Sequence, residues 1–185
     1  MTKTHLVFLL YFLFLSIYGI AEIYLQVRFS RWKFKREEKG FLFILLPFYL
    51  SIYLAPVEHI LLKYNLHTYM VLTGFLLLFF AVILRITAML TIRINFSMHV
   101  EAGKDNYLVI HGIYKYIRHP MYLALLLMSV SGNIIFSSRI VWIFFLLTLA
   151  GILFRIREEE LFLVNQYGEY TDYKQRSYKL IPFIY

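Results

Sequence analysis

The sequence predicts an all-α, polytopic membrane protein with about five transmembrane helices. Its 185 residues, enough for one domain, are 61% hydrophobic and 16% charged, with a mean hydropathy of +0.66. Soluble domains are typically about half apolar and a quarter charged. The second observation is a series of apolar segments, and the third is a distribution of Lys and Arg that alternates with them.

Five apolar segments follow one another along the chain, at residues 4–21, 40–57, 68–84, 120–138 and 140–154. A helix needs about 20 apolar residues to cross about 30 Å of hydrocarbon. The first three segments qualify if their flanking side chains extend to the interface, and the second could continue to residue 62. The last two are separated only by a turn at residues 137–139, which predicts a tight helical hairpin.

The basic residues fix a predicted orientation. Five crossings with the N-terminus outside place 16 of the 19 Lys and Arg residues on the cytoplasmic side, and only Lys3, Lys63 and Arg139 outside. Four or six crossings would break this alternation. Because the positive charge follows the first apolar segment, the pattern also argues against a cleaved signal peptide. We therefore expect the C-terminus and any site near it to be cytoplasmic.

Two compositional features limit the possible functions. The chain has no cysteine, which excludes disulfides and thiolate metal ligands, and we predict no metal site. The net charge of +8 could suggest a nucleic-acid partner. The basic residues instead flank apolar segments, where they set topology and meet anionic lipid headgroups, so we predict membrane lipids as partners and no nucleic acid.

The stretch from Gly112 to Tyr122 joins a polar loop to the fourth apolar segment. Polar groups close to hydrocarbon are costly unless they are paired or functional, so we interpret this stretch as part of a cofactor site. Proline is favoured in the first helical turn, so Pro120 predicts a helix start with His119 at its mouth. The free N–H groups there suit a carboxylate or phosphate. An Arg-His-Pro sequence alone is more often an ordinary cap.

A second charged cluster, residues 155–160, follows the fifth apolar segment. If the helix continues, Arg155 and Glu159 lie on one face. The alternative interpretation is that the arginines end the helix at the headgroups and the glutamates are a solvated extension. The chain then ends in an apolar run from Leu180, which we expect to dock back on the membrane or the loop.

Together these pieces resemble the isoprenylcysteine carboxyl methyltransferase family of membrane enzymes. The resemblance covers about half of the chain, residues 95–185. It is carried, in order, by Leu108-Val109, Gly112-Ile113-Tyr114, Arg118-His119-Pro120-Met121-Tyr122, a helical hairpin, Arg155-Ile156, Glu158-Glu159-Glu160, Tyr167-Gly168, Tyr170, Tyr173 and Ile181-Pro182-Phe183. It divides the single membrane domain into three N-terminal helices, residues 1–90, and a methyltransferase core, residues 91–185.

The resemblance implies S-adenosylmethionine as the methyl donor and a lipidated or amphiphilic acceptor that enters from the bilayer. Arg155 and Glu159 would be the catalytic pair, with Arg155 facing the acceptor carboxylate. The implied cofactor-binding residues are His99, Leu108, Val109, Tyr114, His119, Pro120, Met121, Tyr122 and Glu159. Two positions depart from the family pattern: Ala124 stands where Gly is usual, and His99 stands where some members have Gln.

Three other functions stay open at this point. A phospholipid amine or another small molecule could be the acceptor, although Arg155 would be unfavourable beside an amine. A sterol-reductase-like enzyme with a nicotinamide cofactor could share the architecture. A membrane scaffold with basic loops would bind no cofactor.

Overall fold

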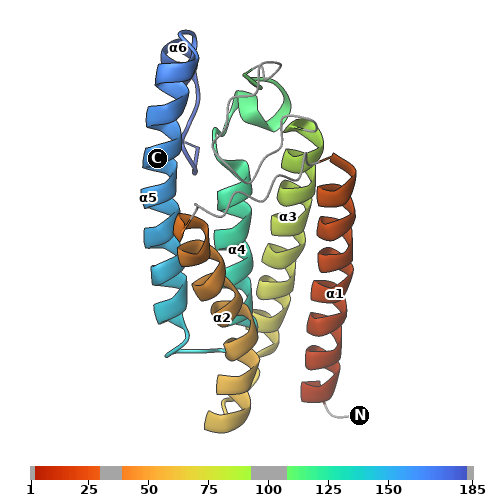
Figure 1. Ribbon diagram of the computed structural model, residues 1–185. Helices are drawn as coiled ribbons and strands as arrows, with labels where there is room; N and C mark the ends of the chain where they lie inside the picture. Colours follow the sequence, from red (N-terminus) through yellow and green to blue (C-terminus); the bar gives the residue numbers. More distant parts are fainter. Residues whose placement is uncertain (1–2, 30–38, 93–107, 183–185) are drawn as a thin grey trace.

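The structure, a computed structural model, describes residues 3–29, 39–92 and 108–182. Within these ranges it contains helices and one isolated bridge, and the predicted all-α class is confirmed. The elements are α1 (Lys3–Phe29), α2 (Lys39–Leu62), α3 (Thr68–Ile92), the short 3₁₀ helix η2 (Gly112–Lys115), α4 (Pro120–Ile135), α5 (Trp142–Gln166) and α6 (Tyr170–Arg176). The long helices α1 to α5 lie side by side in one bundle, with η2 and α6 at the same end of it (Figure 1).

Three of the helices are long and apolar enough to cross a membrane: residues 3–28 of α1, 42–62 of α2 and 68–92 of α3. The α4 helix is apolar but has only 16 residues, and α5 has 25 residues with charges from Arg155 onward. Both α1 and α3 continue past their predicted ends at residues 21 and 84. As a result, Glu22 and Arg85 lie inside helices.

Helix packing is close where glycine faces a neighbouring helix. A Cβ added to Gly74 in α3 would meet Ile135 Cγ1 and lie 3.0 Å from the Ser131 carbonyl oxygen of α4. Small residues allow such approach of membrane helices, where packing rather than the hydrophobic effect drives association. The α3–α4 pair is accordingly the most extensive helix contact of the bundle.

The predicted hairpin of α4 and α5 has its short connection, but its two helices pack mainly on different neighbours. The α4 helix packs on α3, and α5 packs on α2, which lies in front of both in Figure 1. The two helices still contact each other across the short turn, so the predicted hairpin is confirmed. The Glu58 carboxylate of α2 accepts N–H bonds from Arg139 (2.8 Å), Ile140 (3.1 Å) and Val141 (2.9 Å). It satisfies the N–H groups of the connecting turn and of Val141, the N-cap of α5, and so bonds this end of α5 to α2.

Candidate functional site

The loop before α4 leads into the helix as the sequence predicted. His119 is the N-cap, with φ −122° and ψ 56°, and Pro120 is the first helical residue. The His119 side chain is buried. Its backbone N–H donates to the Lys179 carbonyl oxygen at 3.1 Å, so the start of α4 is bonded to the end of the chain.

The C-terminal segment pairs with this loop through Tyr178 and Lys179, immediately before the apolar run that was predicted to dock. Ile117 and Tyr178 form a parallel bridge. The Arg118 N–H donates to the Tyr178 carbonyl oxygen at 2.8 Å, and the Tyr178 N–H donates to the Tyr116 carbonyl oxygen at 2.9 Å. Leu180 is buried in the main apolar core. Phe183, the last residue of the family pattern, lies outside the described residues.

A charged network beneath the docked segment was not assigned to the site from the sequence. Arg118 Nε donates to Glu160 Oε1 at 2.8 Å, and its Nη1 donates to the carbonyl oxygens of Lys174, at 3.1 Å, and Ser177. Lys174 Nζ lies 3.4 Å from Glu160 Oε2. Burial raises the pKa of the Glu160 carboxyl, but the neighbouring His119 and Arg118 outweigh burial and lower this pKa to about 2. Glu160 is therefore buried and paired, and the alternative of a solvated extension does not hold for it.

Four of the predicted site residues meet between α4 and α5. The Tyr122 hydroxyl donates to Glu159 Oε1 at 2.5 Å, and Arg155 Nε donates to the same oxygen at 3.0 Å, as the spacing of four residues predicted. His119 Nδ1 lies 3.6 Å from Glu159 Oε2. The His119 and Tyr122 rings stack with centroids 5.9 Å apart. A cation and an anion thus lie side by side, bordered by aromatic rings.

The remaining described site residues form an apolar wall next to this group. Val109 and Tyr114 are buried together against Ala88 of α3, and Met121 packs on them. The Tyr173 hydroxyl donates to the Tyr114 carbonyl oxygen at 2.5 Å, and burial raises the pKa of the Tyr114 phenol. Pro120 is buried, and Leu108 is half-buried beside Val109. His99 lies outside the described residues.

A buried ion pair between α1 and α3 contacts the first turn of α4. Arg85 Nη2 lies 2.6 Å from Glu22 Oε1, and Arg85 Nη1 donates to the Met121 carbonyl oxygen at 3.3 Å. Tyr18 donates to the same carboxylate at 2.8 Å. The sequence suggested only that Arg85 ends an apolar segment. In the structure the Arg85 side chain joins three helices, because it belongs to α3 and bonds Glu22 of α1 and the Met121 carbonyl oxygen of α4.

The site has a charge arrangement suited to two ligand groups of opposite sign. The Glu159 side chain is 20% exposed and is next to the Tyr122 ring, a combination that favours a cationic group. The Arg155 guanidinium offers a forked donor set to a carboxylate. Among the described residues, no cluster of three or more His, Asp or Glu side chains could hold a metal ion.

The fold and the site are those of a multi-pass integral membrane protein with a charged site at one end of its helices. Residues 70–165 match the model of the isoprenylcysteine carboxyl methyltransferase (ICMT) family. The chain belongs to this family.

Similar proteins agree with this assignment. The protein-S-isoprenylcysteine O-methyltransferase of Mus musculus is 35% identical over 122 residues, which are 63% of this chain and 43% of the mouse protein. The Saccharomyces cerevisiae protein of the same name is 28% identical over 96% of this chain and 80% of its own length. A solved structure of the eukaryotic intramembrane Ras methyltransferase ICMT has a TM-score of 0.56 and 28% identity, over 81% of this chain and 54% of that chain. The present chain thus spans less than half of its mouse relative.

Proposed function

We propose that this chain is an S-adenosylmethionine-dependent membrane methyltransferase that methylates the carboxylate of an isoprenylated cysteine or a similar amphiphilic acceptor. The observation that carries the proposal is the contact of Arg155 and Tyr122 with Glu159, in a chain that belongs to the ICMT family. Relatives that match it are named for O-methylation of isoprenylcysteine.

The residues fit the methyl donor, which when bound would supply an activated methyl group on a sulfonium. In this proposal Glu159 pairs with the amine or the hydroxyls of the cofactor. The rings of Tyr114 and Tyr122 favour its positive charge. The N–H groups at the start of α4, next to Pro120, suit its carboxylate. His119, Met121, Val109, Leu108 and His99 complete the proposed binding set.

Arg155 is the proposed acceptor-binding residue. A carboxylate acceptor is already ionised at neutral pH, so no general base is needed. The protein has to orient the two reactants and exclude water, which can supply much of the barrier reduction. The guanidinium would hold the carboxylate in a forked pair, while the lipid part of the acceptor enters sideways between helices. An amine acceptor, as in phospholipid methylation, would be repelled by Arg155.

We further propose that the site end of the bundle is cytoplasmic and the N-terminus is outside. The support is the distribution of basic residues, because 16 of 19 fall on the site side of a five-crossing arrangement. In this proposal residues 91–185 form the methyltransferase core, and residues 1–90 form the three N-terminal transmembrane helices.

The first experiment is calorimetry of S-adenosylmethionine with the detergent-purified protein, with NADPH in parallel. Saturable binding of S-adenosylmethionine alone, lost in a Tyr122→Ala, Glu159→Ala double variant, supports the proposed reaction class. Methyl transfer to N-acetyl-S-farnesylcysteine, but not to its carboxamide analogue, then supports the acceptor. Binding of NADPH alone would favour the reductase alternative, and binding of neither compound, with the acceptor present, would refute the proposal.

A further inference from the structure

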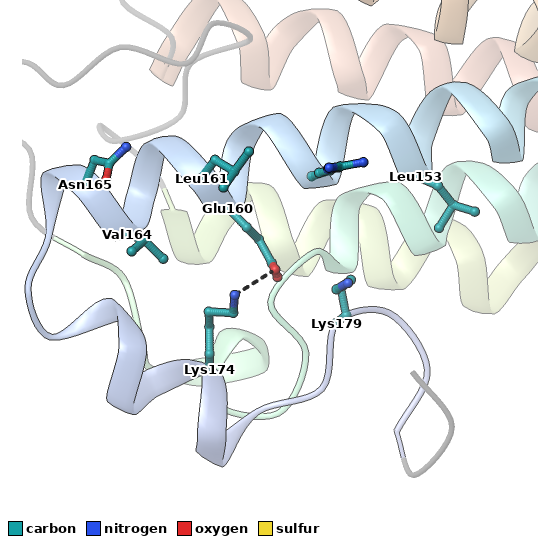
Figure 2. Close-up of a pocket in the computed structure, with 8 residues that line it drawn as sticks. Leu153, Glu160, Leu161, Val164, Asn165, Lys174 and Lys179 are labelled. Atoms are coloured by element: carbon teal, nitrogen blue, oxygen red, sulfur yellow. Dashed lines mark ion pairs between the residues drawn. The ribbon is translucent and has the colours of Figure 1, made fainter.

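An open pocket of about 440 Å³ lies between α5 and the C-terminal segment. Figure 2 shows that its lining comes from one face of α5 and from Lys174 and Lys179 of the tail. Arg157 of this lining is two residues from both Arg155 and Glu159, a rotation of about 200° around a helix. Arg157 therefore faces away from Arg155 and Glu159, whereas Glu160 of the same lining lies 3.4 Å from His119 Nε2, so the pocket is a separate opening that adjoins the proposed methyl-transfer site.

The pocket is cationic. Arg157, Lys174 and Lys179 line it, with Glu160 as the one acidic residue. Glu160 is already compensated, because it pairs with Arg118 outside the lining as well as with Lys174. The lining thus carries three cations and one carboxylate, a charge balance that suits a ligand with a negative group.

The same face of α5 also carries an apolar stripe. Leu153, Leu161 and Val164 line the pocket and are 39%, 56% and 37% exposed. Toward the hairpin turn the stripe continues at helical spacing through exposed Leu146 and Ile143. Arg157 lies between Leu153 and Leu161 and is the first charged residue on this face of α5 after the hairpin turn, at the depth where hydrocarbon would give way to headgroups.

We propose that this pocket binds an anionic phospholipid. The phosphate would lie among Arg157, Lys174 and Lys179, and one acyl chain would follow the stripe from Leu153 to Leu146. The continuous apolar stripe distinguishes a lipid from a soluble phosphate, since a free anion would bury none of it. The excess of cations favours a headgroup with net negative charge over a zwitterionic one. This inference does not depend on the methyltransferase assignment.

Native mass spectrometry of the delipidated, detergent-purified full chain tests the proposal with equimolar palmitoyl-oleoyl phosphatidylglycerol and phosphatidylcholine. We expect retention of phosphatidylglycerol over phosphatidylcholine. The Arg157→Gln, Lys179→Gln double variant should bind phosphatidylglycerol about 10-fold or more weakly, because each cation near a lipid surface adds a similar electrostatic attraction. Arg157→Gln alone, at an exposed position, should give part of this loss.

The matched control is Lys115→Gln, Arg176→Gln, which removes two exposed charges from the same end of the bundle but outside the pocket. It should keep the preference. Equal retention of the two lipids, an unchanged Arg157→Gln variant, or an equal loss in the control would each overturn the proposal. Displacement of the lipid by an equal concentration of glycerophosphoglycerol would overturn it too, because the apolar stripe would then contribute nothing.

Discussion

The Tyr122 hydroxyl donates a 2.5 Å hydrogen bond to Glu159 Oε1 and so joins the first turn of α4 to the charged half of α5. The bond fixes a carboxylate that Arg155 also contacts. Two residues 37 positions apart in sequence thereby set the geometry of the proposed donor site.

Tyr122→Phe should weaken S-adenosylmethionine binding about 10-fold, because a hydrogen bond to a charged group contributes about 1.5–3 kcal/mol. The ring and its stacking on His119 remain, so the variant should fold normally. Calorimetry measures the affinity, and Tyr116→Phe, at an exposed ring in the same loop, is the control. Wild-type affinity in Tyr122→Phe would show that this hydroxyl does not position the donor site.

Arg155→Lys should raise KM for a farnesylcysteine acceptor about 10-fold or more, because lysine keeps the charge but loses the forked geometry. The affinity for S-adenosylmethionine should change much less. Initial rates at saturating donor, together with donor calorimetry, separate the two effects. The assignment fails if the substitution weakens donor binding and leaves the acceptor KM unchanged.

Glu160→Gln should loosen the C-terminal segment. The substitution removes the anion that Arg118 and Lys174 share, and it leaves a buried guanidinium partly uncompensated. Limited trypsin digestion should cut at Lys174 and Arg176 about 10-fold faster. Glu158→Gln, at an exposed neighbour, should digest like the wild type, and equal digestion of all three proteins would argue against this role.

The same carboxyl predicts a pH dependence of tail docking. Because folding lowers the pKa of Glu160 to about 2, its stabilising contribution is complete above about pH 4.5 and is lost as the pH falls toward 2. The difference from an ordinary carboxyl corresponds to at most about 3 kcal/mol. As the pH falls from 4.5 toward 2, hydrogen exchange at the backbone amides of residues 177–180 should become faster relative to the intrinsic rate. In Glu160→Gln this relative exchange rate should not change with pH. The same pH dependence in the variant and the wild type would contradict the assignment.

Local chemistry made part of the fold predictable from the sequence. Pro120 marks the start of α4 because its missing N–H has no partner in a first turn anyway. Arg155 and Glu159 pair because four residues bring side chains to one face of a helix. These predictions needed no knowledge of which helices are neighbours.

The contacts that depend on lateral packing could not be predicted in this way. Glu22 and Arg85 are 63 residues apart, and each stood next to a predicted helix end, where a charge is ordinary. Glu58 gave no sign that it would accept N–H bonds from the turn before α5. Runs of apolar residues identify membrane helices. They do not show which helices are neighbours, because side chains that face lipid and side chains that face another helix are both apolar.

The Glu22–Arg85 ion pair gives the last prediction. Arg85→Met alone should lower the free energy of unfolding by about 3–5 kcal/mol, because it leaves the buried Glu22 carboxylate without its cation. The Glu22→Met, Arg85→Met double variant should recover most of this loss, since an apolar pair replaces both charges. Thermal unfolding in detergent measures both variants, and Lys63→Met, at an exposed cation on the opposite end of the bundle, is the control. Because Arg85 also donates to the Met121 carbonyl oxygen, the recovered double variant should still bind S-adenosylmethionine a few-fold more weakly. A double variant as unstable as the single one would show that the ion pair itself, rather than relief of an unpaired charge, holds α1 and α3 together.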